Sequence, residues 1–265
     1  MSASTRSHES QQDARTTGCY VYAVVPADVE LNRGSKGVGD PPSDVSLVHH
    51  RKVAALVSEI PLDRPLGTPA DLVAYSHLLD AAALETPVLP MRFGAVMADE
   101  RAVVEQLLGP HEDEFRAALA ELEGRAEYVI KGRYVENALF NEIVSANPDI
   151  ARTRDELRDK PPETTRDARI ALGEAVNAAI VALREADTKH LVDAVAPHCV
   201  AVRIGEAVQE RDLAQVAVLV EGRRQGELED ALDGIAGHWR GRVNLRLLGP
   251  LAAYDFVVTQ AQKEV

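Results

Sequence analysis

The segment Pro87–Met97 constrains the fold most strongly, because it is apolar and yet contains two prolines. Pro90 has no N–H group for a sheet ladder, and inside a helix it would clash with the preceding turn. The segment therefore predicts an edge strand or a bulged strand, which Gly94 bends and in which Arg92 lies among hydrophobic side chains. Since it offers no catalytic side chain, it indicates a structural or recognition element.

The length and composition favour two domains with aliphatic cores. A chain of 265 residues suggests two domains, with one as the alternative. The hydrophobic fraction of 46% is enough for real cores, but aromatic residues make up only 4%. Valine, leucine, isoleucine and alanine must therefore supply most of the packing.

The charge of the chain argues against two classes of partner. Its net charge is −13, from 29 basic and 42 acidic residues. Nucleic acid binding needs a basic face that displaces counterions, and an anionic membrane surface also attracts basic proteins. We therefore expect no nucleic acid and no membrane partner, and we interpret the charge as favouring solubility.

Both termini are expected to be tails, residues 1–18 and 259–265. The N-terminal stretch is rich in serine, threonine, glutamine and charge, which predicts disorder, and it lacks the apolar core of a signal peptide. No run approaches the roughly 18 apolar residues of a transmembrane helix. We expect a soluble, cytoplasmic protein.

The first half predicts a mixed α+β domain over residues 19–124. A hairpin is expected to turn near His50 and Arg51, and Thr68 and Asp99 are expected to cap helices. Residues 33–42, rich in glycine, are interpreted as an exposed loop. The expected order is βββαβαα, with strands at 19–25, 45–49, 52–60 and 87–97, and helices beginning near 69, 100 and 110.

The second half predicts a more regular domain over residues 125–258. Val200, Val202 and Ile204 alternate with other residues, which is typical of a strand with one buried face. Apart from a helical insertion, the order is β-α-β-β-α-β, the ferredoxin-like arrangement. The expected strands are 127–133, 198–205, 213–221 and 242–249, and the expected helices are 134–146, 148–160, one from Thr164 or Thr165, and 224–237.

The sequence contains no recognisable reaction centre. It has no nucleophile elbow, P-loop or dinucleotide fingerprint, and its eight histidines lack metal-ligand spacing. Cys19 and Cys199 are interpreted as core residues inside strands, with a disulfide left open. The acidic run Glu112–Glu114 is typical of the first turn of a helix. We therefore predict no catalytic residue, no cofactor and no metal.

Two aromatic features stay open between packing and partner binding. Arg92, Phe93 and Gly94 place a cation beside an aromatic ring in an apolar strand. Tyr254 and Phe256 lie in an expected extended tail after the last strand. Both features fit core or inter-domain packing, and both fit a partner-binding surface, where arginine and aromatic residues are favoured.

Four segments together carry a family resemblance. The chain resembles the gas vesicle protein F/L family in residues 20–24, 88–96, 127–131 and 249–257. The resemblance implies a two-domain α+β accessory protein with a ferredoxin-like C-terminal domain and no catalysis. It implies that the protein takes part in gas vesicle assembly or nucleation, binding the small hydrophobic shell protein and other accessory proteins at the gas vesicle.

Two other functions remain as alternatives. A small-molecule-binding regulatory protein is one, because ferredoxin-like scaffolds often carry such sites, although this rests on fold analogy. An enzyme of unrecognised type is the other.

Overall fold

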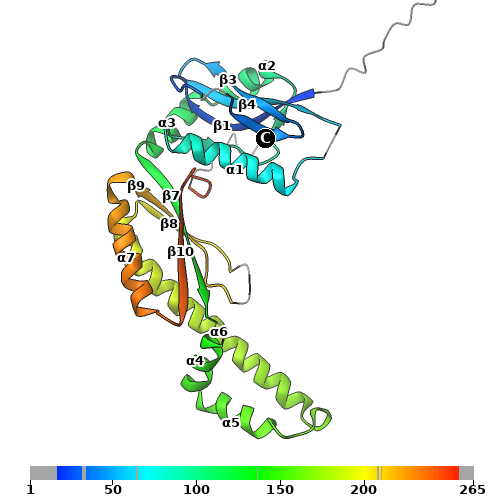
Figure 1. Cartoon of the computed structure of the whole chain (residues 1–265), viewed down its shortest axis with the longest axis vertical. Helices are drawn as coiled ribbons and strands as arrows, with labels where there is room; N and C mark the ends of the chain where they lie inside the picture. The colour runs from blue at the N-terminus through cyan, green and yellow to red at the C-terminus, as the bar shows by residue number, and fades with distance from the viewer. Residues whose placement is uncertain are drawn as a thin grey trace, which may run out of the picture. The chain divides into compact units, whose positions relative to one another are not determined.

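The computed structural model describes residues 17–31, 34–63, 65–135, 137–207, 209 and 211–256, which form two compact units divided between Glu121 and Leu122 (Figure 1). Of the expected tails, only Thr17 and Gly18 are described, and both belong to the first strand. The predicted tail 259–265 and Arg33 of the predicted loop lie outside the described residues. Ten strands and seven α-helices are described, so the class is α+β, as predicted.

The first unit is built on an antiparallel sheet of order β2-β3-β4-β1-β5, with β6 also paired to β1. Strand β1 is buried over nearly its whole length, because helices lie on both sides of the sheet (Figure 1). Its continuous apolar sequence is typical of a strand with two covered faces. The strands are β1 (Thr17–Pro26), β2 (Lys36–Gly39), β3 (Pro42–His50), β4 (Val53–Pro61), β5 (Leu89–Pro90) and β6 (Val96–Met97).

The helices of this unit begin at the predicted caps. Thr68 and Asp71 form a capping box at the start of α1 (Pro69–Ala83). The Asp99 carboxylate accepts the Ala102 N–H at 2.7 Å, which starts α2 (Glu100–Ala102). A π-helical stretch, η1 (Val103–Leu108), and α3 (Glu112–Leu122) follow. The hairpin turn at Arg51 is confirmed, with φ at +50°.

The predicted loop 33–42 is wrong, because it contains strand β2. Gly37 and Val38 are buried, and the Val38 N–H donates to the Tyr22 hydroxyl at 2.8 Å. A Cβ at Gly37 would lie 2.0 Å from that hydroxyl. Glycine is therefore needed at position 37 for the close approach of a tyrosine rather than for a flexible loop. Strand β2 adds one strand to the order βββαβαα that was expected for the first half of the chain.

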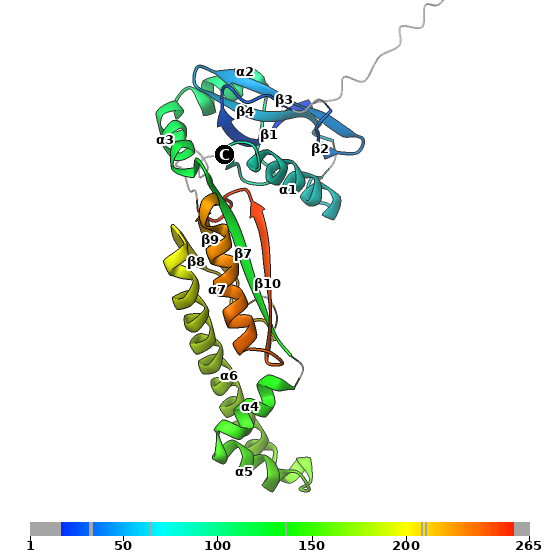
Figure 2. The ribbon, with the colours of Figure 1, turned by 60° about the vertical axis from the view of Figure 1, so that its left-hand side comes forward.

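The second unit has a four-stranded antiparallel sheet of order β10-β7-β9-β8. Part of α6 and all of α7 cover one face, visible in Figures 1 and 2. The buried side chains Leu228, Leu232 and Ile235 of α7 form an apolar stripe that faces the sheet. The strands are β7 (Arg125–Tyr134), β8 (Ala201–Ile204), β9 (Val216–Glu221) and β10 (Val243–Leu251), and α7 is Gln225–His238.

The expectation that β8 buries one face is only partly correct. Val202 is partly buried in the core, but Val200 is 45% exposed and Ile204 is 58% exposed. Strand β8 is short and lies at the edge of the sheet, so side chains at its ends meet no covering helix.

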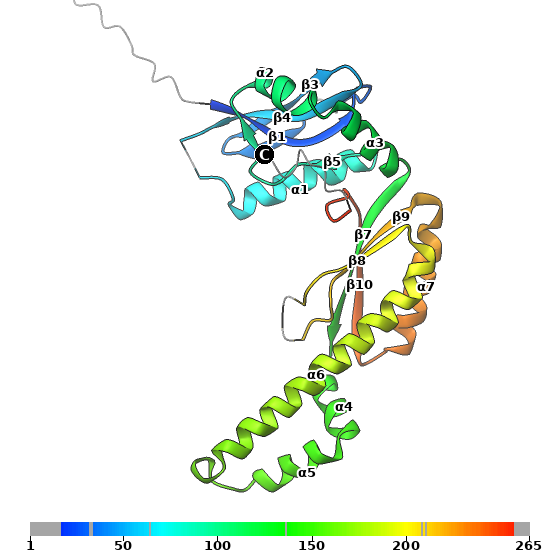
Figure 3. The ribbon, with the colours of Figure 1, turned by 180° about the vertical axis from the view of Figure 1, so that it is seen from behind.

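A helical insertion extends from the second unit, as predicted. It consists of α4 (Ala138–Ala146), α5 (Pro148–Leu157) and the far half of α6 (Arg166–Val195), which lie beside one another in Figures 1 and 3. Thr165 precedes α6 but makes no capping bond: its hydroxyl donates to the Pro161 carbonyl and accepts the Arg169 Nε–H at 3.0 Å.

A polar network joins the insertion to the sheet. The Arg242 guanidinium binds Glu142 of α4 at 2.6 and 3.0 Å and Asp187 of α6 at 2.7 Å. The Tyr134 hydroxyl donates to the same Asp187 carboxylate at 2.6 Å. Burial, followed by this bond to Asp187, raises the pKa of Tyr134 well above its usual value, so its hydroxyl stays a donor.

Candidate functional site

The segment Pro87–Met97 forms two short edge strands joined by a turn. Strands β5 and β6 both pair with β1, which confirms the predicted edge position. Between them, the Met91 N–H donates to the Tyr22 carbonyl at 2.8 Å, and the Val21 N–H donates to the Ala95 carbonyl at 2.9 Å. We call residues 91–95 the aromatic turn.

The conformation of the aromatic turn depends on Gly94, whose φ is +87°. Residues with a side chain rarely adopt this left-handed region of φ, whereas glycine adopts it at low cost. The Ala95 N–H donates to the Arg92 carbonyl at 3.0 Å and closes the turn. The prediction that Gly94 bends the segment is therefore confirmed, and the bend breaks the strand in two.

Phe93 anchors the turn in a cluster of tyrosines. Its ring meets Tyr20 of β1 edge-on at 6.1 Å between centroids and Tyr75 of α1 edge-on at 5.4 Å. The ring centroids of Tyr20 and Tyr22 are 4.6 Å apart. Sequence reasoning missed this cluster, although the two-residue spacing of Tyr20 and Tyr22 in a strand signals a shared face.

The tyrosine hydroxyls hold the backbone of the turn. The Gly94 N–H donates to the Tyr20 hydroxyl at 2.9 Å, and the Tyr75 hydroxyl donates to the Met91 carbonyl. Burial raises the pKa of Tyr20 to about 12 and also raises the pKa of Tyr75. Both hydroxyls are therefore neutral near pH 7, and they brace the turn on β1 and α1.

Arg92 does not lie among hydrophobic side chains, which corrects the sequence interpretation. The turn around Gly94 directs it outward, and its side chain is exposed. Within the described residues the Arg92 guanidinium has no hydrogen-bond or ion-pair partner. A fixed backbone thus presents a free cation at the sheet edge, while Phe93 next to it faces inward.

We expect Phe93→Ala to lower the free energy of unfolding by about 2 kcal/mol, since the half-buried ring makes two edge-to-face contacts. Arg92→Ala should change it by less than about 0.5 kcal/mol, as expected for an exposed surface residue. Urea unfolding of both variants measures the difference. Equal losses would contradict this division between anchor and exposed cation.

The C-terminal aromatic residues belong to the second unit, and they lie in a turn rather than in the predicted extended tail. The Asp255 N–H donates to the buried Glu127 carboxylate at 2.8 Å. Phe256 lies under the Arg203 guanidinium, 5.9 Å from the ring centroid. Tyr254 is half-buried, and it lies between the buried Ala253 and the exposed Asp255. Phe256 therefore contacts another residue of the second unit through its ring, and Tyr254 is only partly buried.

The chemistry of the cysteines does not favour a reaction centre. Cys19 and Cys199 are both free thiols, which answers the open question of a disulfide. Burial raises the pKa of each thiol to about 11, so neither forms the reactive thiolate near pH 7. Among the described residues, no group of three histidine, cysteine, aspartate or glutamate side chains is arranged to hold a metal.

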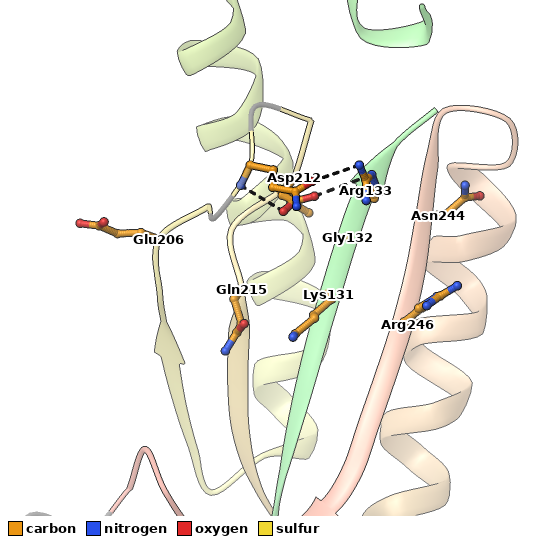
Figure 4. A pocket seen from close by; sticks show the side chains of 10 residues that line it. Lys131, Gly132, Arg133, Glu206, Asp212, Gln215, Asn244 and Arg246 are labelled. Atoms are coloured by element: carbon orange, nitrogen blue, oxygen red, sulfur yellow. Dashed lines mark hydrogen bonds and ion pairs between the residues drawn. The ribbon is translucent and has the colours of Figure 1, made fainter. Parts of the chain in front are cut away.

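A second candidate surface was missed from the sequence. A pocket of about 410 Å³ lies on the face of the second sheet that α6 and α7 leave uncovered (Figure 4). Its basic lining comes from alternate positions of neighbouring strands, Lys131 and Arg133 of β7 and Arg246 of β10. The sequence does show polar or charged residues two positions apart in each strand. Only the pairing of β7 with β10 shows that these residues line the same pocket.

The arrangement defines a two-unit α+β protein whose candidate sites are exposed surfaces rather than a reaction centre. The model of the gas vesicle synthesis protein GvpL/GvpF family matches residues 18–258, and the chain belongs to this family of gas vesicle accessory proteins. The predicted family resemblance is thereby confirmed.

Individual relatives agree with this assignment. The chain is 32% identical to gas vesicle protein F of Streptomyces sp. strain CB03234 over 90% of this chain and 98% of the relative. It is 28% identical to gas vesicle protein L1 of Halobacterium salinarum, covering 91% and 90% of the two chains. The crystal structure of GvpF from Anabaena sp. PCC7120 matches with a TM-score of 0.76 at 21% identity, over 92% of this chain and 99% of that one.

None of the helices in the described parts of the chain is both long enough and apolar enough to cross a membrane.

Proposed function

We propose that this chain is a non-enzymatic assembly protein that binds the small hydrophobic shell protein and other accessory proteins while gas vesicles form in the cytoplasm. Family membership supports the setting. We also propose that residues 19–124 and 125–258 are two domains and that the second is ferredoxin-like. Its strand order and its helices on one face support that description.

The observation that carries the proposal is the braced aromatic turn with exposed Arg92 at a sheet edge. Arginine is favoured at the centre of protein interfaces. The edge is made of two-residue strands, and Pro90 lacks an N–H, so it can accept a partner without extended uncontrolled pairing. The turn is therefore suited to specific contact.

Exposed apolar side chains near the turn fit a hydrophobic partner. Leu72 and Val73 of α1 are 48% and 52% exposed, within one helical turn of Tyr75. Leu62 is 50% exposed and lies, like Val96 of β6, beside Gly18. Exposed large apolar side chains such as these are candidate contacts for a hydrophobic partner.

Co-purification with co-expressed shell protein tests the proposal. Arg92→Ala should weaken capture by roughly tenfold, since truncating an interface arginine often costs more than 1 kcal/mol. The matched control is Lys52→Ala, another exposed cation of the same unit, which should capture normally. Failure of the wild-type protein to bind would overturn the function, whereas equal capture by both variants would overturn only the assignment to the turn.

A further inference from the structure

The uncovered face of the second sheet holds basic side chains in a chain that is acidic as a whole. Along β7, the buried Ile130 and Tyr134 belong to the core beneath the helices, and the alternate residues Lys131 and Arg133 are exposed on the opposite face. On β10, Arg246 occupies the same exposed face. Figure 4 shows these side chains projecting from the neighbouring strands.

Lys131 and Arg246 are directly opposite one another in the antiparallel register. Like charges in this position destabilise a sheet. In the described parts of the chain, neither side chain forms a hydrogen bond or an ion pair. The fold thus places two cations at opposite backbone positions of β7 and β10, with no counter-ion for either among the described residues.

The acidic side chains of the pocket do not neutralise this pair. Asp212 lies 3.9 Å from Arg133, whose guanidinium also donates to Gln209 at 3.1 Å. Glu206 is exposed and points away from the other labelled side chains (Figure 4). The remaining lining combines amide groups from Gln215 and Asn244 with the apolar Leu213 and Gly132.

We infer that this pocket docks an acidic segment of a partner protein, whose carboxylates lie against Lys131 and Arg246. Guanidinium and ammonium groups bind carboxylates through strong charge-assisted hydrogen bonds, and the two amides can donate further bonds. A volume of about 410 Å³ accommodates a few side chains. A short acidic segment fits better than nucleic acid, because a net charge of −13 repels a long polyanion. The inference does not depend on the contact proposed for the aromatic turn.

Fluorescence anisotropy of the full chain with a labelled hexaglutamate peptide tests this inference. Binding should be seen at low salt and should weaken as salt screens the charges. Lys131→Gln and Arg246→Gln should each weaken binding about threefold to fivefold, as expected for partly exposed ion pairs. Arg240→Gln removes an exposed cation elsewhere in the same unit and should leave the affinity unchanged.

Competing probes identify the outcomes that overturn the inference. Equal binding of hexaglutamine would show that carboxylates are not recognised. Tighter binding of a single-stranded oligonucleotide would favour nucleic acid, and equal competition by free glutarate would favour a small metabolite. An unchanged affinity in both pocket variants would place the peptide elsewhere.

Thermal unfolding of the free protein gives an independent readout. Arg246→Gln should raise the melting temperature, because it removes the repulsion from Lys131, while it weakens peptide binding. A variant that loses binding only through misfolding would melt at a lower temperature. Opposite changes in stability and affinity therefore support a docking role, and a lower melting temperature would count against it.

Discussion

Replacing Arg242 with alanine is expected to lower the free energy of unfolding of the second unit by about 3 kcal/mol, the effect of breaking a largely buried ion pair. The side chains of Arg242 and Asp187 are only 23% and 11% exposed. Without the guanidinium, the Asp187 carboxylate would keep the Tyr134 hydroxyl but lose its positive partner. Glu142 would lose both of its bonds from Arg242, which loosens α4 from the sheet.

Tryptophan fluorescence during urea unfolding measures this loss. Trp239 is the only tryptophan of the chain, it is buried, and Arg242 lies 5.8 Å from its ring centroid, so the signal reports on the second unit. Arg240→Ala, on the exposed surface two residues away, is the control and should change stability by less than about 0.5 kcal/mol.

A second substitution tests the physical cause. If the unpaired carboxylate causes the loss, adding Asp187→Asn to Arg242→Ala should recover about 1 kcal/mol, because the buried charge disappears. A double variant less stable than Arg242→Ala alone would indicate that the loss comes from packing instead.

Much of the fold could be predicted because local chemistry decides it. Thr68 and Asp99 cap helices through their own side-chain oxygens, whatever surrounds them. The apolar runs of β1 and β9 are likewise set by neighbouring residues. The order of elements in the second unit followed from such signals.

The failures share one physical cause, which is contact between residues distant in sequence. Gly37 indicated a loop by composition, but its partner is Tyr22, 15 positions earlier, and glycine is needed there because the tyrosine hydroxyl leaves no room for a side chain. Val200 and Ile204 have the pattern of a covered face, and only the position of β8 at the sheet edge exposes them. The periodicity of a strand's sequence does not show where that strand lies in the sheet.

The candidate sites show the same limit. The segment holding Arg92 and Phe93 was identified from its proline and glycine, but the outward direction of Arg92 depends on the turn that Gly94 permits. The pair of Lys131 and Arg246 was not predicted, because 115 positions separate the two residues and only the register of β7 and β10 places them opposite one another.

Gly37→Ala is expected to lower the free energy of unfolding of the first unit by about 3 kcal/mol, combining overpacking with a disturbed buried hydroxyl. The new methyl group would lie 2.0 Å from the Tyr22 hydroxyl oxygen and 3.2 Å from the Ser58 hydroxyl oxygen. Tyr22 is fully buried, and its hydroxyl bonds Ser58 at 2.8 Å and accepts the Val38 N–H at 2.8 Å. The ring cannot move away without giving up these bonds and its contact with Tyr20.

Gly173→Ala is the matched control, since it adds the same methyl group inside α6, where a Cβ would meet no atom within 4 Å apart from its chain neighbours and the helix's own backbone. It should stabilise the protein by about 0.5–1 kcal/mol, the difference in helix propensity between the two residues. Urea unfolding followed by circular dichroism compares the two variants. If Gly37→Ala were as stable as the wild type, β2 would not be held against Tyr22, and the glycine would belong to a loop after all. Opposite signs for the same chemical change would show that close approach, rather than backbone freedom, requires glycine at position 37.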